Sequence, residues 1–325
     1  MMSWKKIAHS SPLLWRLAQG SPSPVSWVGL GRITELLARL FPPQGPPVLI
    51  LSLPRSGSSW VGEILGHASN ALYLREPITQ SNMQQRQAKE AVISMETADE
   101  YLQAFSDNAF AGIPDFFPDV TTETSQWGLV GRTKKKVVIK EVNPLASRWL
   151  ISNYKPRIIF IIRHPAAIAS SFNKLGWTDI NLSHIKNSLN QIDIKALNFE
   201  NAVFEKNDFW SIFGVLCGGC YFYMLNILNE YSDSMIVSYE ELCIDSIKIF
   251  YQIFKFSELR WDSDIEMLIN NKSSSNNAIN PYSTDRYTNQ MPDRWRKILS
   301  KERLECLQKS YHLFDLPWYM SDSEW

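Results

Sequence analysis

Short apolar runs that each end in a turn recur along this chain, and longer helical patterns lie between them. The runs are too short for buried helices and are bounded by glycine, proline or polar residues, which is typical of strands in a parallel sheet. They lie at residues 48–53, 71–74, 137–139 and 156–162. Residues 166–172 and 209–230 instead have the composition of helices. We therefore predict an α/β fold with a central parallel sheet flanked by helices on both faces.

Residues 25–41, which precede the first strand, have the pattern of an amphipathic helix. The apolar residues of this pattern are Val28, Ile33, Leu36, Leu37 and Leu40, and the charged ones are Arg32, Glu35 and Arg39. Such a helix either packs on the core of the protein or rests on a membrane surface, and we favour packing. The proline-rich residues 42–47 follow as a stiff joint. We expect an N-terminal helical extension over residues 1–46 and one large domain over 47–325.

The first strand leads into a loop of small and hydroxyl residues, Pro54 to Ser59, and then into a helix start. A tight loop between a strand and a helix N-terminus points several backbone N–H groups at one spot, where the helix dipole adds positive charge. Arg55 adds a full charge to these donors. The loop lacks the Lys-Ser/Thr ending that binds phosphate and magnesium in a P-loop. We therefore predict a P-loop-like, three-layer fold whose phosphate site needs no metal.

A second anion-binding edge is predicted where the run 156–162 ends. Arg163 follows the last apolar residue, Pro165 turns the chain into a helix, and Ser171 lies two turns into that helix. In open α/β sheets, ligands bind outside the carboxyl ends of the strands. The two edges together indicate a ligand with two separate phosphate groups.

The sequences PRSGSSWV and RHPAAIASS at these edges resemble the nucleotide signatures of the sulfotransferases that use 3′-phosphoadenylyl sulfate (PAPS). The arginine-led loop and the later Leu74-Arg75-Glu76-Pro77 are similar to those of carbohydrate sulfotransferases and their bacterial relatives. Segments at 237–242 and 294–299 extend the resemblance over residues 48–299. It implies that Arg163 and Ser171 bind the 3′-phosphate of the donor. It also implies that the first loop binds the 5′-phosphosulfate, through Arg55, Ser56, Gly57, Ser58, Ser59 and Trp60.

The resemblance also indicates the catalytic groups. Glu76 is the expected general base, because it should lie at a strand end near the donor loop, where a carboxylate can take the acceptor's proton. Alternatively, Glu76 pairs with Arg75 or Arg55 and only orders the loop. Arg55 and Lys140 are expected to stabilise the charge that grows on the leaving 5′-phosphate.

Two further expectations depend on where the chain departs from the family. The cytosolic enzymes carry a histidine base two residues after the catalytic lysine, and here that position is Val142, so Glu141 is the fallback base. The late R-K-G loop of those enzymes is also missing. Arg286 is therefore our first choice for a late contact to the donor, with Arg294 and Arg296 as alternatives.

Composition bounds the remaining possibilities. Basic and acidic residues number 33 each, so no global field draws the chain to nucleic acid. Cys217 and Cys220 form a C-x-x-C pair inside an apolar helical segment, where close packing is a better explanation than redox chemistry. No histidine spacing indicates zinc, and no stretch is predicted to span a bilayer. Without a signal sequence, we expect a cytoplasmic protein, with peripheral membrane contact through residues 25–41 as the alternative.

The sequence thus predicts in-line transfer of a sulfuryl group from PAPS to a hydroxyl, which releases 3′,5′-ADP and uses a carboxylate base. The expected acceptor is a carbohydrate or glycoconjugate such as a glycolipid. The 12 tryptophans and 12 tyrosines agree with sugar binding, although phenols or lipids would use aromatic residues too. Two alternatives stay open, namely a nucleotide kinase or other NTPase and a catalytically silent nucleotide-binding protein.

Overall fold

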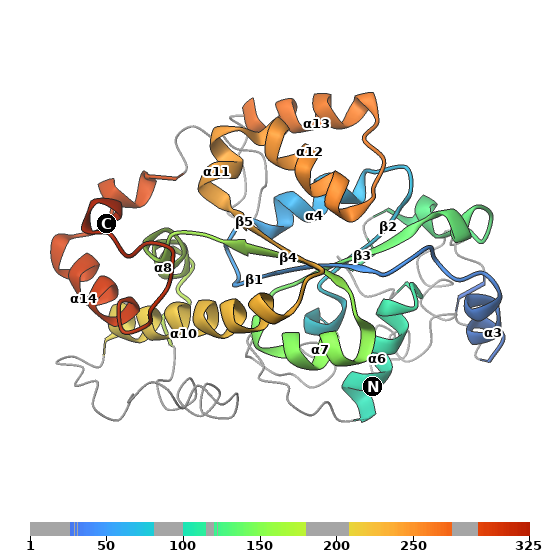
Figure 1. Cartoon of the computed structure of the whole chain (residues 1–325), viewed down its shortest axis with the longest axis horizontal. Coiled ribbons are helices and arrows are strands. Elements are labelled where there is room, and N and C mark those ends of the chain that lie inside the picture. Colours follow the sequence, from blue (N-terminus) through green and yellow to red (C-terminus); the bar gives the residue numbers. More distant parts are fainter. Residues whose placement is uncertain are drawn as a thin grey trace, which may run out of the picture.

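Five parallel strands form one sheet in the order β2-β3-β1-β4-β5 (Figure 1). The computed structural model describes residues 27–28, 30, 32–80, 100–114, 120–121, 123–179, 208–274 and 292–325. The strands are β1 (Val48–Ser52), β2 (Ala71–Arg75), β3 (Lys136–Glu141), β4 (Arg157–Ile162) and β5 (Ser234–Ser238). The predicted parallel sheet is confirmed, and each apolar run that we expected to be a strand is one.

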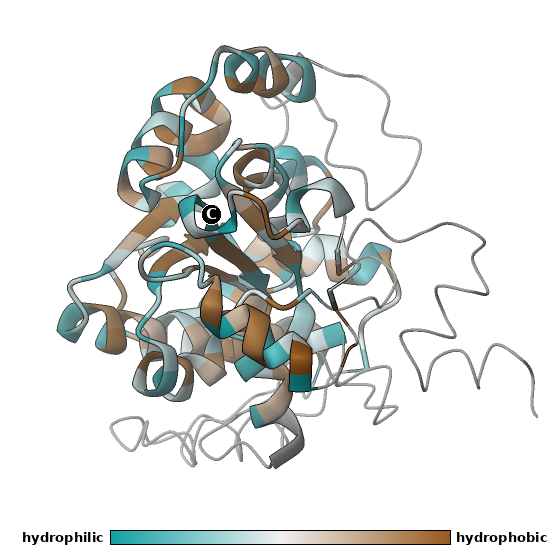
Figure 2. Ribbon diagram, turned by 90° about the vertical axis from the view of Figure 1, so that its right-hand side faces the viewer, coloured by the Kyte–Doolittle hydropathy of each residue, from teal (hydrophilic) through white to brown (hydrophobic). Residues whose placement is uncertain are grey.

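Alternate residues of each strand point to opposite faces of the sheet, so the sheet separates two apolar cores. Leu49 and Leu51 of β1 face one core, whereas Val48 and Ile50 face the other. The first core is covered by α6 (Glu100–Phe110), α7 (Ser147–Tyr154), α8 (Pro165–Lys174), α10 (Phe209–Glu230) and α14 (Lys301–Tyr311). The second is covered by α4 (Ser58–Gly66), α11 (Tyr239–Ile244), α12 (Ser246–Ser257) and α13 (Ser263–Ser274). Figures 1 and 2 show the resulting three layers, with apolar strands in the middle.

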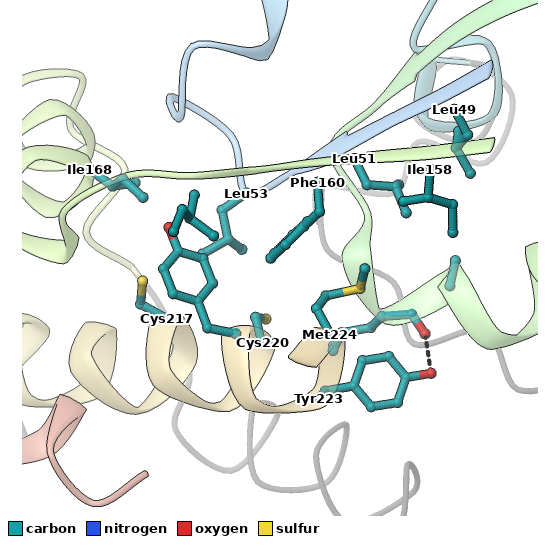
Figure 3. Close-up of a cluster of buried hydrophobic side chains, with 14 of the residues drawn as sticks. Leu49, Leu51, Leu53, Ile158, Phe160, Ile168, Cys217, Cys220, Tyr223 and Met224 are labelled. Carbon is teal, nitrogen blue, oxygen red and sulfur yellow. Dashed lines mark hydrogen bonds between the residues drawn. The ribbon is translucent and has the colours of Figure 1, made fainter. Parts of the chain in front are cut away.

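Helix α10 packs across the first core. Figure 3 shows its Cys217, Cys220 and Met224 facing the side chains of strands β1 and β4. Both thiols are buried, and burial raises their pKa, that of Cys220 to about 12. A Cβ on Gly218 would lie 2.4 Å from the ring of Phe314, so this glycine allows the chain after α14 to pack closely. The packing explanation of the C-x-x-C segment is therefore confirmed for Gly218.

Helix α10 has the length and composition of a membrane-spanning helix, contrary to our expectation that no stretch would. Its most apolar 18-residue window has a mean hydropathy of 1.6, and 83% of that window is buried inside the protein. A helix that is apolar all round and buried is the usual core helix of a large α/β domain. Figure 1 accordingly places α10 along the sheet.

The chain leaves two neighbouring strands toward opposite faces of the sheet. After β1 it enters α4, which packs in the second core, and after β4 it enters α8, which packs in the first. The loops that follow these strands therefore diverge. This is the switch point at which open α/β sheets bind ligands.

Helix α6 begins at Glu100, and residues 81–99 lie outside the described part of the chain. Helix α13 ends at Ser274, and residues 275–291 lie outside that part as well. Helix α3 (Arg32–Leu40) exists and packs on the domain through buried Thr34 and Ala38 and half-buried Leu37, whereas Ile33, Leu36 and Leu40 stay exposed. The proposed division at residue 46 stays a prediction.

Candidate active site

The loop after β1 turns sharply through two left-handed residues. Arg55 has a φ of 70° and Gly57 a φ of 96°, and the turn brings the N-terminus of α4 next to the end of β1. A Cβ at Gly57 would lie 2.3 Å from the ring of Tyr239, so only glycine fits here. The first amides of α4 lack helical partners and are available to an anion, as the sequence predicted.

The serines of this loop have different surroundings. Ser58 is buried and hydrogen-bonds to Ser52 across 2.7 Å, which ties the helix start to the strand end. Ser56 is also buried, and its hydroxyl has no partner among the described residues. Ser59 is half-buried. Trp60 packs its ring against Phe250 in the second core, and its amide donates to the Gly57 carbonyl at 3.0 Å, so its predicted contact with the donor stays a prediction.

Arg163, at the end of β4, is held in place by Tyr221 of α10. The Tyr221 hydroxyl accepts a hydrogen bond from the Arg163 amide at 2.9 Å and donates one to the Arg163 carbonyl at 2.8 Å. The guanidinium lies 4.2 Å from the centre of the Tyr239 ring and donates from Nη1 to the carbonyl of Arg55 at 2.8 Å. Its Nε is buried without a partner among the described residues.

The two predicted anion-binding edges meet in the structure. The Nε of Arg55 donates to the Ser171 hydroxyl at 2.9 Å, so Arg55, Ser171 and Arg163 gather at one place. The buried Nε of Arg163 and the buried hydroxyl of Ser56 are polar atoms that a bound phosphate could satisfy. These residues therefore fit a ligand with more than one anionic group, as PAPS has.

Glu76 and Lys140 form an ion pair at the ends of two neighbouring strands. The register of β2 and β3 places Arg75 opposite Lys140, and the Glu76 amide donates to the Lys140 carbonyl at 2.6 Å. Glu76 itself is left-handed, with a φ of 51°, an uncommon conformation for a non-glycine residue that is found at functional sites. The Lys140 ammonium donates to Glu76 Oε1, so Lys140 is the ion-pair partner of Glu76 among the described residues.

This pairing sets the charge of Glu76. Burial alone would raise the pKa of Glu76, but the charge and the hydrogen bond of Lys140 outweigh burial and hold the pKa below its usual value. Both side chains are largely shielded from water. Near neutral pH the pair therefore consists of a carboxylate and an ammonium.

Glu141, the fallback base, is engaged elsewhere. It accepts hydrogen bonds from the amide of Ile78 at 2.7 Å and from the hydroxyl of Thr79 at 2.5 Å. Burial raises the pKa of Glu141 to about 7, with a further contribution from the charge of Glu76. Both of its oxygens therefore hold the turn that follows Glu76 and Pro77.

The late basic residues give no described contact to this site. Arg286 lies outside the described residues. Arg294 is exposed, and Arg296 donates to the carbonyls of Glu324 and Trp325. Trp295 stacks on the ring of His164, with centroids 4.4 Å apart, and so packs against the residue that follows Arg163.

Sequence reasoning missed two residues that support the site, Tyr221 and Tyr239. The ring of Tyr239 contacts the Arg163 guanidinium and closely approaches Gly57. Its neighbour Glu240 accepts hydrogen bonds from the His164 amide and from the Tyr319 hydroxyl. The segment 237–242 had been noted as a family-like sequence, so the signal for Tyr239 was present. Tyr221 had no signal, because nothing in an apolar helix distinguishes one buried tyrosine from another.

Residues 45–321 match the family described as "Sulfotransferase domain". No curated protein matches significantly. Among solved structures, the sulfotransferase domain of the curacin biosynthetic pathway is 16% identical, with a TM-score of 0.45 over 84% of this chain and 100% of that one. The sulfotransferase domain of the Synechococcus PCC 7002 olefin synthase is 16% identical, with a TM-score of 0.44 over 85% and 97%. A mouse sulfotransferase complexed with PAP is 13% identical, with a TM-score of 0.39 over 85% and 87%.

The family match covers most of the chain and includes every described residue of the site. It agrees with the two edges, after β1 and β4, that the sequence predicts to bind anions. The chain therefore belongs to the sulfotransferase domain family and is a PAPS-dependent sulfotransferase.

Proposed function

We propose that the enzyme sulfates a hydroxyl of a carbohydrate or glycoconjugate and uses Glu76 as the general base. The observation that carries this proposal is the Glu76–Lys140 pair at the ends of β2 and β3. Lys140 also lies on the strand next to β1, whose loop binds the donor in our proposal. PAPS, when bound, supplies an activated sulfuryl group and a 3′,5′-ADP leaving group.

Donor binding is assigned to the two loops at the switch point. The α4 amides, with Ser56, Ser58 and Ser59, would hold the 5′-phosphosulfate. Arg163 and Ser171 would hold the 3′-phosphate, and the contact of Arg55 with Ser171 supports a place for Arg55 between the two groups. A contact from Arg286 stays a prediction.

Lys140 has two roles in this proposal. Its ammonium stabilises the charge on the leaving oxygen, where a preorganised cation contributes a few kcal/mol, about 3 for comparable single donors. As Lys140 turns toward that oxygen, its attraction for the Glu76 carboxylate weakens. The pKa of Glu76 then rises, because burial remains, and the carboxylate becomes a stronger base.

Glu141 is assigned a positioning role instead of catalysis. Its two oxygens bind Ile78 and Thr79, so they are occupied by the turn that carries Glu76. The Glu76 Oε2 has only a long contact, 3.4 Å from the Gln80 side chain, so it is freer to meet an acceptor hydroxyl than either oxygen of Glu141. This difference favours Glu76 over Glu141.

The carbohydrate class of the acceptor rests on the similarity of Leu74 to Pro77 to the carbohydrate sulfotransferases. A kinase or NTPase is disfavoured because the donor loop lacks the Lys-Ser/Thr ending. The cytoplasmic location expected from the sequence stays a prediction.

The test is an acceptor screen with sulfur-labelled PAPS against a panel of sugars, glycolipids, phenols and sterols, with wild type and Glu76→Gln in parallel. The proposal expects label on a sugar hydroxyl with wild type only. Label on phenols or sterols alone would overturn the acceptor class, and full activity of Glu76→Gln would overturn the base. Binding of 3′,5′-ADP without transfer to any acceptor would favour the silent alternative.

A further inference from the structure

Helix α3 carries a row of large apolar side chains on its outer face. Ile33, Leu36 and Leu40 are 56%, 55% and 62% exposed, and exposure continues at Leu30 and Phe41, just beyond the two ends of the helix. We call these five residues the α3 stripe. A single exposed leucine is ordinary on a protein surface, but a row at helical spacing indicates an interaction site.

Buried contacts at both ends of α3 fix the direction of the stripe. Before the helix, the carbonyl of Trp27 accepts a hydrogen bond from Thr34 at 2.8 Å, and the Trp27 indole donates to the carbonyl of Trp127 at 2.8 Å. After the helix, buried Arg132 donates to the carbonyl of Phe41 at 2.8 Å. The Arg132 guanidinium also lies over the Trp27 ring, with its central carbon 4.9 Å from the centroid. The helix cannot roll its apolar side chains inward without breaking these bonds.

Positive charge accompanies the stripe. Arg32 and Arg39 lie on α3, and both side chains are exposed. Helical spacing places them along one edge of the stripe. The whole chain has no net charge, yet its first 41 residues include five basic side chains and one acidic one, Glu35. The segment before α3 contributes Lys5, Lys6 and Arg16 to this excess.

An apolar helical face with arginines at its edge is complementary to an anionic lipid surface. The apolar side chains enter the boundary between head groups and acyl chains, while the arginines contact the phosphates. A second copy of the same helix would instead bring like charges together, which opposes self-association. Charge thus favours the lipid surface among the possible occupants of the stripe.

We propose that the α3 stripe docks the enzyme on an anionic membrane surface. Figure 1 places α3 at one end of the molecule and α14, with the C-terminus, at the other. The proposal concerns where the enzyme works and is independent of the identity of the acceptor.

The experiment is sedimentation of the full chain with vesicles of phosphatidylcholine alone and of phosphatidylcholine mixed with phosphatidylglycerol. Wild type should partition to the anionic vesicles and much less to the neutral ones. Combined Ile33→Ser, Leu36→Ser and Leu40→Ser should weaken that partition by at least about tenfold, because three apolar side chains leave the lipid boundary. Combined Arg32→Ser and Arg39→Ser should remove most of the preference for anionic lipid.

The matched control is Ile244→Ser with Met267→Ser, which removes exposed apolar side chains elsewhere on the surface and should bind vesicles as wild type does. All variants should bind 3′,5′-ADP as wild type does, which shows that they are folded. Failure of wild type to bind anionic vesicles, or equal binding by the triple serine variant, would overturn the proposal. So would a wild-type dimer in light scattering that becomes a monomer in that variant, because the stripe would then be a self-interface.

Discussion

The side chain of Arg55 donates a hydrogen bond to the hydroxyl of Ser171, 116 residues further along the chain, at 2.9 Å. Arg55 belongs to the loop after β1 and Ser171 to the helix after β4, so this contact joins the two anion-binding edges. Arg163 strengthens the junction through the carbonyl of Arg55. The two edges that the sequence predicts to bind phosphate groups are therefore neighbours in the structure.

Replacement of Glu76 by glutamine tests the general base. Glutamine has nearly the same shape but cannot accept the acceptor's proton at neutral pH, so kcat should fall by about 10²- to 10⁴-fold. Steady-state kinetics with labelled PAPS and the acceptor from the screen measures this loss. Affinity for 3′,5′-ADP should change little, because the proposal gives Glu76 no donor contact.

Glu241→Gln is the matched control for that substitution, since Glu241 is exposed near the start of α11. It should leave kcat unchanged. A Glu76→Gln enzyme that turns over within about threefold of wild type would exclude Glu76 as the base, because such a change is smaller than any acid–base contribution of this kind.

Lys140→Met tests the electrostatic coupling within the pair. In wild type, Lys140 holds the pKa of Glu76 below its usual value against the opposing effect of burial. Without the ammonium, burial remains and the pKa of Glu76 rises above its usual value. The acid limb of the kcat/KM profile against pH should therefore move to higher pH, together with an overall loss of rate. An unmoved acid limb would mean that Glu76 is not the group that titrates.

Glu141→Gln tests the positioning role through stability. Burial raises the pKa of Glu141 from its ordinary 4.5 to about 7, so the folded protein prefers the protonated acid. That contribution is fully present below the unfolded pKa and is lost as pH rises through about 7. Glutamine can keep the bonds to Ile78 and Thr79 without a charge, so the variant should gain on the order of 1–3 kcal/mol over wild type at pH 8.

The measurement for Glu141→Gln is the free energy of unfolding in urea at pH 5 and pH 8. The advantage of the variant should shrink at the lower pH, where wild-type Glu141 is also neutral. A variant that is less stable than wild type at pH 8 would show that the Glu141 carboxylate is needed as an anion.

Gly57→Ala tests the close approach of the donor loop to Tyr239. The new Cβ would lie 2.3 Å from the ring, at a φ of 96°, so the loop or the ring must move. Affinity for 3′,5′-ADP should fall at least about tenfold, since the α4 amides and the Arg163–Tyr239 contact both shift. Calorimetric titration measures the affinity.

Gly131→Ala separates backbone strain from steric contact. Gly131 also has a positive φ, of 75°, but a Cβ there meets no atom within 4 Å. This variant should lose stability, by about 1 kcal/mol from strain alone, and keep its affinity for 3′,5′-ADP. Equal losses of affinity in the two variants would contradict the role given to the ring of Tyr239.

Much of the fold was predictable because its signals are local. The apolar runs became strands β1 to β4, and residues 209–230 became α10 with the expected bounds. Glu76 and Lys140 were placed at strand ends from the same local patterns. Their pairing was not predictable, because it depends on β3 inserting between β1 and β2, which is a tertiary choice. The sequence alone therefore predicted that Glu76 and Lys140 belong to the site but not that they form a pair.

The side chains that support the site were harder to predict, because they come from distant elements. Tyr221 reaches Arg163 from α10, 58 residues away, and Glu141 binds Thr79 across 62 residues. The orientation of α3 also depended on tertiary contacts. Amphipathicity indicated an apolar face, but the bonds made by Thr34 and Arg132 hold Ile33, Leu36 and Leu40 outward while Leu37 packs on the core.

The most direct test of the account is calorimetric titration of the full chain with 3′,5′-ADP in EDTA, beside ATP with magnesium. Wild type should bind 3′,5′-ADP at about micromolar Kd without metal, a free energy near −8 kcal/mol. Arg163→Ala should abolish that binding, while Lys174→Ala, at the exposed end of α8, should leave it unchanged. Preference for ATP with magnesium, or undiminished binding by Arg163→Ala, would contradict the proposed donor site.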